Sequence, residues 1–207
     1  MKILITGFAP FNNEKINPSY EAVKLLPDKI NDIIIEKLEV PVSYLNGYME
    51  VYSKIKYEDY DAIILVGQAG GRSVISLEKV AINYCYANIS DNDGLSFNHS
   101  NIYYDGADAY FTTLPIIKME ETLKENNIKA AISYTCGTFV CNDLMYRVLH
   151  YLKMKNKKTR AGFIHVPYIK EQVENKENMP YMELSEIVEA LKICVVCALE
   201  EEKKLWN

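Results

Sequence analysis

Two hydrophobic patterns alternate along the chain, and together they predict its fold. Short apolar runs, most of them rich in β-branched residues, occur at residues 2–8, 61–66, 130–132 and 162–167, and a partly alternating run occurs at residues 33–42. Runs of this kind are typical of buried strands. Apolar residues three and four positions apart predict helices at residues 18–26, 44–57, 114–125, 140–152 and 185–203. The alternation indicates an α/β fold, a three-layer α/β/α sandwich around a mixed, mostly parallel sheet, in a single domain over residues 1–207.

A glycine-rich loop, GQAGGR, occupies residues 67–72. It matches neither of the phosphate-binding patterns GxGxxG and GxxxxGK, and residues 74–87 after it alternate like a strand. Nucleotide binding is therefore disfavoured. Within that strand Glu78 has apolar neighbours, so it is either an edge carboxylate in water or the buried partner of a cation. Residues 91–108 are polar and irregular, and residues 171–179 are predicted to be a polar loop.

The segment at residues 130–153 holds the main candidate nucleophile. A short strand ends in a corner of small residues at 135–138, and a helix with apolar residues every fourth position begins after it. Cys141 lies in the first turn of that helix, where free backbone N–H groups and the helix dipole favour a thiolate. The alternative is that Cys141 packs as a small apolar residue, as most buried cysteines do.

Four segments end or follow predicted strands, and we expect them to meet at one edge of the sheet. They are the loop at residues 8–11, the loop at 67–72, the helix start at Cys141, and His165 near the end of a strand. In α/β sheets the functional crevice lies at the carboxyl ends of the strands. His165 is the candidate general base, because His99 lies in the irregular tract and His150 is about two and a half helical turns beyond the thiol. Spacing alone leaves open which of the 28 carboxylates orients it.

Composition and charge limit the partners. The formal charge is -5 and the 23 Lys and Arg residues are scattered, which argues against nucleic acid. No apolar run is long enough to span a membrane, and a first strand that begins at Lys2 leaves no room for a signal peptide. Five cysteines without the spacing of a disulfide framework indicate reduced thiols and a cytoplasmic protein. Cys194 and Cys197 are expected to pack on the apolar stripe of the last helix rather than to hold a metal.

Several longer motifs occur in order along the chain: GFAPF, NPS, GQAGGR, LEKVAIN, SYTCGTFVCN and GFIHVPY. In these motifs and their separations the chain resembles the pyroglutamyl peptidase type I family, also called pyrrolidone carboxyl peptidases, over nearly its whole length. The resemblance implies a cysteine peptidase that removes N-terminal pyroglutamate from peptides through a thioester. It also implies a protein that needs no metal or cofactor and forms a homo-oligomer, a tetramer or a dimer.

The resemblance further implies roles for individual residues. Cys141 would be the nucleophile, His165 the general base and then acid, and Glu78 the group that orients the imidazole. The residues implied to bind the pyroglutamyl ring are Phe8, Phe11, Asn17, Gln68, Ile89 and Phe139. An apolar slot with a few polar groups suits this small, uncharged ring. Backbone N–H groups near Val140 and Cys141 could hold the tetrahedral oxygen.

Three sites depart from the family pattern. Asn88 stands where the family usually has an arginine, Cys136 where it prefers alanine, and Asn12 and Asn13 where it has a glycine pair. Loss of the arginine puts catalytic efficiency in question unless a residue such as Arg72 compensates. One alternative is therefore a weakened homologue that binds pyroglutamyl peptides with little turnover. Another, by fold analogy alone, is a phosphorylase or a nucleoside hydrolase.

Overall fold

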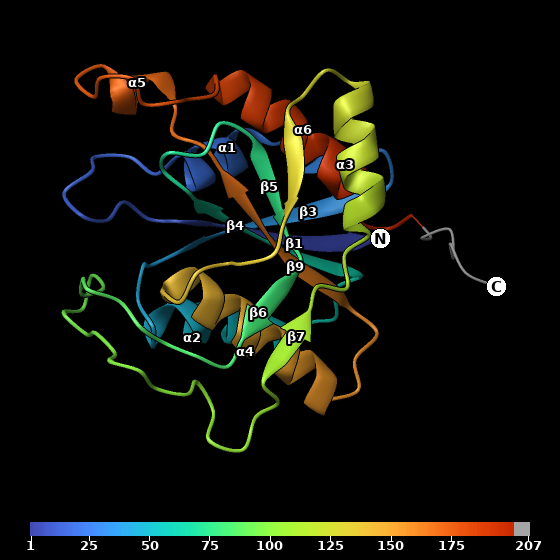
Figure 1. The fold of residues 1–207 in the computed structure, drawn as a ribbon. Helices are drawn as coiled ribbons and strands as arrows, with labels where there is room; N and C mark the ends of the chain where they lie inside the picture. The colour runs from blue at the N-terminus through green and yellow to red at the C-terminus, as the bar shows by residue number, and fades with distance from the viewer. Residues whose placement is uncertain (201–207) are drawn as a thin grey trace.

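The computed structural model describes residues 1–200 and is built on a seven-stranded sheet (Figure 1). Its strands are β1 Lys2–Phe8, β2 Lys29–Ile30, β3 Ile33–Val40, β4 Ala62–Gln68, β5 Ile75–Glu78, β8 Ala130–Ser133 and β9 Arg160–Val166. They lie in the order β2-β3-β1-β4-β9-β5-β8. Strands β3, β1, β4 and β9 are parallel, whereas β2, β5 and β8 run in the opposite direction. The prediction of a mixed, mostly parallel sheet is confirmed.

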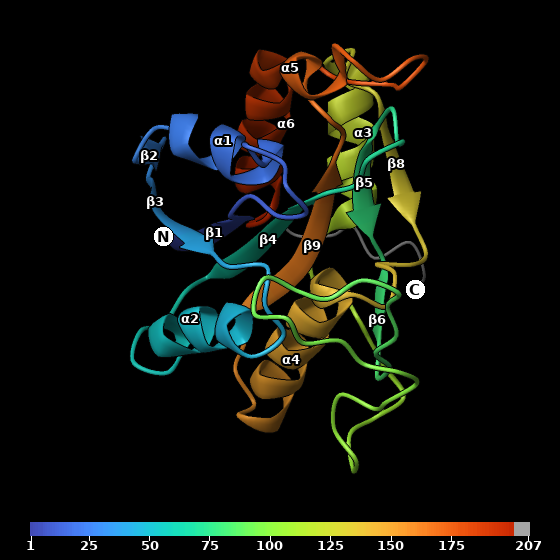
Figure 2. The same cartoon turned by 90° about the vertical axis from the view of Figure 1, so that its left-hand side faces the viewer.

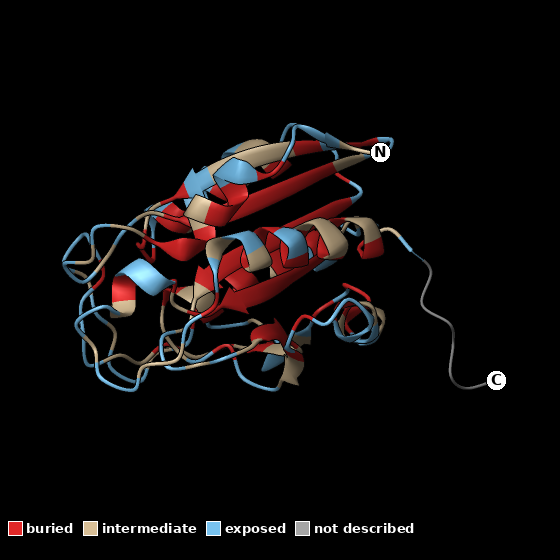
Figure 3. Ribbon diagram, turned by 90° about the horizontal axis from the view of Figure 1, so that it is seen from above, coloured by how far each residue is buried: buried red, intermediate tan, exposed pale blue. Residues whose placement is uncertain are grey.

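Helices cover both faces of this sheet (Figures 1 and 2). One face carries α1 Pro18–Leu25, α3 Ile116–Glu125 and α6 Leu184–Cys197, and the other carries α2 Asn46–Ile55 and α4 Val140–Met154. Figure 3 shows the largely buried strands beside helices whose outward sides are exposed. The predicted three-layer α/β/α arrangement is likewise confirmed.

The two helix layers explain why the central strands are apolar at most positions. In β1, Ile3 and Ile5 pack in the core beneath α1 and α6, while Leu4 between them packs in the core beneath α2 and α4. Successive side chains of a strand point to opposite faces, so a strand that is covered on both sides needs a continuous apolar run.

Helix α1 begins as its sequence predicts and is tied to the end of β1. The Asn17 side chain accepts a hydrogen bond from the backbone N–H of Ser19 at 3.2 Å, and Pro18 occupies the first helical position. The Ser19 hydroxyl in turn accepts from the backbone N–H of Phe8 at 2.9 Å. These bonds bring Asn17 and Phe8 to the same end of the sheet.

Residues 74–87, predicted as one extended strand, are divided between two sheets. The first part is β5, and the second part, β6 Val80–Ile82, pairs with β7 Ala109–Phe111 in a separate two-stranded sheet. Between them, the N–H of Lys79 donates to the carbonyl of Ser133 at 2.7 Å, and its carbonyl accepts from the N–H of Thr112 at 3.0 Å. Backbone pairing to two different neighbours at Lys79 separates β5 from β6.

Other differences from the prediction are smaller. Residues 171–179, predicted as a loop, include most of a short helix, α5 Lys170–Val173. The last helix, predicted over residues 185–203, ends at Cys197, and Lys203 lies outside the described residues. Strands β2 and β7 escape prediction because runs of 2 and 3 residues carry almost no periodicity.

Candidate active site

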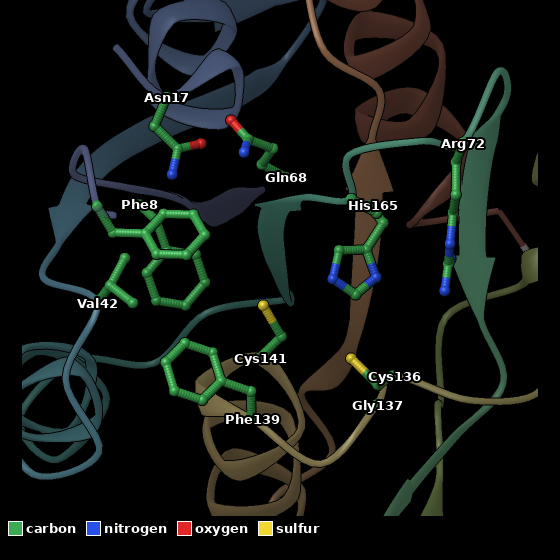
Figure 4. A pocket seen from close by; sticks show the side chains of 12 residues that line it. Phe8, Asn17, Val42, Gln68, Arg72, Cys136, Gly137, Phe139, Cys141 and His165 are labelled. Atoms are coloured by element: carbon green, nitrogen blue, oxygen red, sulfur yellow. The ribbon is translucent and has the colours of Figure 1, made fainter. Parts of the chain in front are cut away.

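A cavity of about 220 Å³ lies beyond the carboxyl ends of β1, β4 and β9, on the face that α4 covers (Figure 4). It is lined by Phe8, Phe11, Asn17, Val42, Gln68, Ala69, Arg72, Cys136, Gly137, Phe139, Cys141 and His165. Most of these residues come from the loops after β1 and β4, from the start of α4 and from β9. The predicted meeting of four chain segments at one place is confirmed.

The path by which Cys141 reaches the cavity differs from the prediction. Strand β8 runs antiparallel to β9, and its last residue is level with Phe163 in the middle of β9 rather than with the carboxyl end. Residues 134–139 then lead the chain to the start of α4. Gly137 has a φ of 76°, a left-handed conformation that glycine adopts without strain. The Thr138 hydroxyl donates to the carbonyl of Tyr86 at 2.7 Å. The corner, rather than the strand, thus positions the thiol.

Cys141 is the second residue of α4, and its half-buried thiol faces the cavity (Figure 4). Gly67 of β4 passes close to it. A Cβ atom at position 67 would lie 3.2 Å from Cys141 Sγ and 2.7 Å from Phe163 Cζ. Glycine at this position therefore leaves the space that the thiol and the aromatic ring occupy.

Asn142 anchors the first turn of α4. Its fully buried amide accepts from the backbone N–H of Ile82 and donates to the carbonyl of the same residue, each at 2.9 Å. It also donates to the carbonyl of Tyr84 at 3.0 Å. Because these bonds hold the helix start against β6, they also fix the direction of the Cys141 side chain. The sequence predicts no role for Asn142, and its position directly after the candidate nucleophile is the signal that would have found it.

His165 and Glu78 form a buried pair on neighbouring strands. His165 Nδ1 lies 2.7 Å from Glu78 Oε1, and Glu78 is completely buried. The register places Glu78 opposite Phe163, so that it lies diagonal to His165 across the β5–β9 pair. Of the two alternatives left open for Glu78, the buried carboxylate with a cationic or hydrogen-bonding partner is the one observed.

Arg72 is the second partner of the same carboxylate. Its Nη1 lies 2.7 Å from Glu78 Oε1, and its Nη2 donates to the carbonyl of Thr135 at 3.4 Å. Arg72 also lines the cavity, which the sequence suggests only through the GQAGGR motif. The site therefore contains a guanidinium that shares Glu78 Oε1 with the imidazole of His165.

The surroundings set the charge of the pair. Burial raises the pKa of Glu78, but the hydrogen bond from His165, the charge of the imidazole when it is protonated at low pH, and Arg72 together outweigh burial and hold that pKa below its usual range. Burial lowers the pKa of His165, and the carboxylate of Glu78 offsets this effect only in part. The imidazole is therefore neutral near pH 7. Since its Nδ1–H donates to Glu78, the lone pair on Nε2 is free to accept a proton.

The thiol of Cys141 is protonated at rest. Burial raises its pKa to about 12, the negative charge of Glu78 adds to the rise, and Arg72 and the backbone N–H of Cys141 oppose it. The expectation of a resting thiolate is therefore wrong, because loss of solvent outweighs the favourable helix start. The sulfur and the imidazole face one cavity, and no hydrogen bond joins these two described side chains (Figure 4). A nucleophilic sulfur thus requires proton transfer to a base.

The cavity has an aromatic side and a polar side (Figure 4). Phe8, Phe11 and Phe139 form the aromatic side together with Val42, and the rings of Phe11 and Phe139 lie 6.5 Å apart. The amides of Asn17 and Gln68 lie on the polar side. Val42, Ala69 and Gly137 are lining residues that the sequence did not single out.

Ile89 is the predicted ring-binding residue that the structure does not bring to the cavity. It is 47% exposed and is not among the lining residues. Residues 88–90 form an exposed bend beside the buried Asp91, whose carboxylate accepts from the backbone N–H groups of Tyr44 and Leu95. Asp91 is thus bound to the loop at residue 44, whereas the nearby Ile89 is exposed to solvent.

The positions that depart from the family pattern have separate explanations. Asn88 is exposed, does not line the cavity, and accepts a hydrogen bond from the Tyr86 hydroxyl at 2.9 Å. Cys136 is buried in the cavity wall, and burial raises its pKa well above the ordinary value. Asn12 and Asn13 have φ values of 53° and 62°. Asparagine adopts these left-handed conformations more readily than most other non-glycine residues.

Within residues 1–200, no group of three or more His, Cys, Asp or Glu side chains is placed to share a metal ion. Over the same residues, no helix has the length and apolar character that crossing a membrane requires.

Comparisons with known proteins agree on one family. A family model described as pyroglutamyl peptidase matches residues 1–201. The chain is 47% identical over 199 residues to a pyrrolidone-carboxylate peptidase of Brachyspira hyodysenteriae, covering 96% of this chain and 99% of the relative. It is 45% identical over 205 residues to one from Alkaliphilus oremlandii, covering 99% and 96%.

Solved structures give the same result. The crystal structure of pyroglutamyl peptidase I from Bacillus amyloliquefaciens superposes with a TM-score of 0.92 at 43% identity over 96% of each chain. A mutant pyrrolidone carboxyl peptidase from Pyrococcus furiosus superposes with a TM-score of 0.93 at 39% identity over 97% of this chain and 99% of that one. In sequence, in fold and over nearly its full length, the chain belongs to the pyroglutamyl peptidase family.

Proposed function

We propose that this chain is a cysteine peptidase that removes N-terminal pyroglutamate from peptides, with Cys141 as nucleophile, His165 as general base and acid, and Glu78 as the group that orients the imidazole. Membership of the family supports the activity. The observation that carries the assignment of residues is the 2.7 Å contact between His165 and Glu78 beside the thiol-bearing cavity. A nucleophile, a base and an orienting carboxylate are the three parts that thiol-based acyl transfer needs.

The shape and polarity of the cavity fit a pyroglutamyl ring. At about 220 Å³ it is smaller than the sites that hold drug-sized ligands, which begin at roughly 300 Å³. Its aromatic side suits a flat ring, and the amides of Asn17 and Gln68 suit the polar groups of a lactam. Among the described residues that line it, none has a carboxylate. A free amino terminus would need such a partner, whereas the uncharged lactam does not.

The proposed reaction uses one proton carrier throughout. His165 Nε2 accepts the proton of Cys141 Sγ as the sulfur attacks the pyroglutamyl carbonyl carbon. Backbone N–H groups at Val140 and Cys141 are the proposed donors to the oxyanion. The imidazolium then protonates the leaving nitrogen, the C–N bond breaks, and a thioester remains. Water gives a proton to Nε2 and attacks the thioester, the C–S bond breaks, and the thiol is restored.

Three further parts of the proposal concern the whole protein. A single catalytic domain over residues 1–207 is supported by helices that pack on both faces of the sheet over the described residues. A cytoplasmic location is supported by the five free cysteines. A homo-oligomer, tetramer or dimer, and peptides with N-terminal pyroglutamate as partners follow from the family resemblance. Light scattering of the purified protein tests the oligomer directly.

The activity is tested with a pyroglutamyl-coumarin substrate, with prolyl-coumarin as the control that lacks the ring carbonyl. We expect the wild type to hydrolyse the first and not the second, and Cys141→Ala to lose turnover. Turnover that survives in Cys141→Ala would reject the nucleophile. Activity that requires phosphate and resists iodoacetamide would instead support a phosphorylase or nucleoside hydrolase, and tight binding with little turnover a weakened homologue.

A further inference from the structure

Gln172 is a buried amide that no step of the proposed reaction uses. It lies on α5, far along the chain from the polar side of the cavity, yet its Nε2 donates to Oε1 of Gln68 at 2.8 Å. The same nitrogen lies 3.4 Å from the carbonyl oxygen of Ile16. Its Oε1 accepts from the backbone N–H of Ile169 at 3.2 Å. The Gln172 side chain thus links Gln68 to the backbone at Ile16 and at Ile169.

These contacts fix which way the Gln172 amide points. The N–H of Ile169 can only donate and the carbonyl of Ile16 can only accept, so the oxygen of Gln172 must face the first and its nitrogen the second. A side chain that reaches back to the backbone N–H at the helix start is a common capping arrangement. A backbone N–H always donates and a backbone carbonyl always accepts, whereas a side-chain amide can swap its two ends by rotation. The two backbone groups therefore set the orientation of the Gln172 amide.

The orientation is passed on to Gln68. Because Gln172 donates an N–H, Gln68 must accept it with Oε1. The Nε2 of Gln68 therefore points away from Gln172. In Figure 4 the nitrogen of Gln68 lies on the side of Cys141 and its oxygen on the far side. No described residue accepts a hydrogen bond from that nitrogen. Gln68 consequently presents only donors to the cavity.

Asn17 is polarised in the same sense by different partners. Its oxygen accepts from both the N–H and the hydroxyl of Ser19, at 3.2 and 2.7 Å. Its nitrogen donates one hydrogen to the carbonyl of Ala9 at 3.1 Å, which leaves its second N–H. Both amides on the polar side of the cavity therefore have committed oxygens and uncommitted N–H groups, an arrangement that matches a ligand acceptor.

We infer that Gln172 is a positioning residue for substrate specificity, which holds Gln68 as a hydrogen-bond donor to the ring carbonyl of the pyroglutamyl group. The inference rests on the proposed function and names the contact by which the site distinguishes a lactam from a ring without a carbonyl. A site whose buried groups are fixed as hydrogen-bond donors binds a ligand without a matching acceptor more weakly, because those donors are then left unpaired.

The sharpest variant is Gln172→Glu, which keeps the shape and reverses the polarity. Assayed at alkaline pH, the introduced carboxylate offers only acceptors, so the Gln68 amide must turn its nitrogen toward it and its oxygen toward the cavity. We expect KM for pyroglutamyl-coumarin to rise about 5- to 50-fold with kcat within about twofold, because the ring carbonyl is remote from the reacting bond. Gln172→Met, which only frees Gln68, should raise KM about 2- to 5-fold.

Two ring probes identify the group that Gln68 contacts. 2-Pyrrolidone has a carbonyl and an N–H, whereas cyclopentanone has the carbonyl alone. If Gln68 donates to the carbonyl, Gln172→Glu weakens the binding of both probes by similar factors. A variant that weakened 2-pyrrolidone but not cyclopentanone would show that its effect does not pass through the ring carbonyl, and would overturn the inference.

A double-mutant cycle separates positioning from a general loss of structure. In a Gln68→Ala background, Gln172→Glu should raise KM no further, since its effect passes through Gln68. Glu171→Gln, at the exposed neighbouring position of α5, is the matched control and should leave KM unchanged. A further rise in the Gln68→Ala background, or an unchanged KM in both Gln172→Glu and Gln172→Met, would refute the relay.

The outcomes keep this inference apart from the proposed function. Calorimetric titration with the two probes needs no turnover, so the relay is tested even in a protein that cleaves nothing. A wild type that binds both probes without hydrolysing pyroglutamyl-coumarin would reject the function alone. If Gln172→Glu does not fold, as thermal melting would show, Gln172→Met in the wild-type and Gln68→Ala backgrounds tests the relay in its place.

Discussion

His165 Nδ1 lies 2.7 Å from Glu78 Oε1, although 87 positions separate the two residues in the chain. The contact exists because β5 pairs with β9 in an antiparallel direction. It commits one ring nitrogen to a buried carboxylate and leaves the other facing the cavity. The direction of this hydrogen bond therefore determines which nitrogen can serve Cys141.

Glu78→Gln should reduce kcat by a factor on the order of 10²–10⁴ and leave KM nearly unchanged. The amide keeps the shape of the side chain but removes the charge that stabilises the imidazolium and fixes the tautomer. Steady-state kinetics with pyroglutamyl-coumarin measures both constants. Glu189→Gln, an exposed residue paired with Lys192 on α6, is the control and should have wild-type kinetics. A kcat within tenfold of wild type would remove Glu78 from the proposed mechanism.

The pH profile should follow from the neutral imidazole. Because burial lowers the pKa of His165 from 6.5, we expect kcat/KM to fall on the acid side with a midpoint below pH 6.5. On the alkaline side the thiol, with a pKa raised to about 12, should leave activity level through neutral pH. The free energy of unfolding should also fall as the pH drops through 6.5, since His165 then binds a proton in the unfolded state but not in the folded state. A midpoint above pH 7 would contradict this account.

Arg72→Met should move the acid limb of kcat/KM toward higher pH. Arg72 lowers the pKa of both Glu78 and His165, so its removal raises both. We also expect a loss of about 1–3 kcal/mol in the free energy of unfolding, because a hydrogen bond to a buried carboxylate is lost. Profiles recorded for wild type, Arg72→Met and the charge-preserving Arg72→Lys measure the shift. An unmoved acid limb in Arg72→Met would show that the guanidinium does not act on the pair.

Gly67→Ala should lower both stability and kcat. The new Cβ would lie 2.7 Å from Phe163 Cζ and 3.2 Å from Cys141 Sγ, so the ring and the thiol must shift. Overpacking of this kind costs about 1–3 kcal/mol. Thermal melting and steady-state kinetics measure the two effects. Adding Phe163→Leu, which removes the Cζ atom, should restore part of the stability; equal melting temperatures for Gly67→Ala and wild type would refute the clash.

Asn88→Arg should leave kcat/KM within about twofold of wild type. Asn88 is exposed and outside the cavity lining, and surface substitutions of this kind change free energies by less than about 0.5 kcal/mol. Arg72 already supplies a positive charge beside Glu78. A gain of tenfold or more would instead show that the enzyme is weakened for want of an arginine at position 88.

Most strands and helices could be predicted from the sequence, because burial of a strand on both faces leaves a strong hydrophobic pattern. The runs that became β1, β4 and β9 are mostly apolar for that reason, and the Asn17–Pro18 start of α1 is a local signal that needs no tertiary contact. Strand direction is different. Periodicity is the same in either direction, so nothing in residues 130–133 indicated that β8 runs against β9.

The residues that line the cavity were predictable in part, with Ile89 wrongly included and Val42 missed, whereas their electrostatics was not predictable. The family motifs contain Cys141, His165 and Glu78, yet the pKa of the thiol depends on burial by chain segments that meet only in the fold. The helix start at Cys141 is visible in the sequence, and its favourable effect is outweighed by that burial. The exposure of Ile89 is likewise a property of the folded loop, in which the neighbouring Asp91 binds the backbone of both Tyr44 and Leu95.

The antiparallel pairing of β5 with β9 also has a kinetic consequence. The pairing closes a very long loop of chain, and contacts between residues so far apart in sequence form late and slowly during folding. Glu78 and His165 therefore meet only once the native topology is complete. In a refolding experiment, enzymatic turnover should return later than the circular-dichroism signal of the helices. The rate at which turnover returns would then report on the last stage of folding.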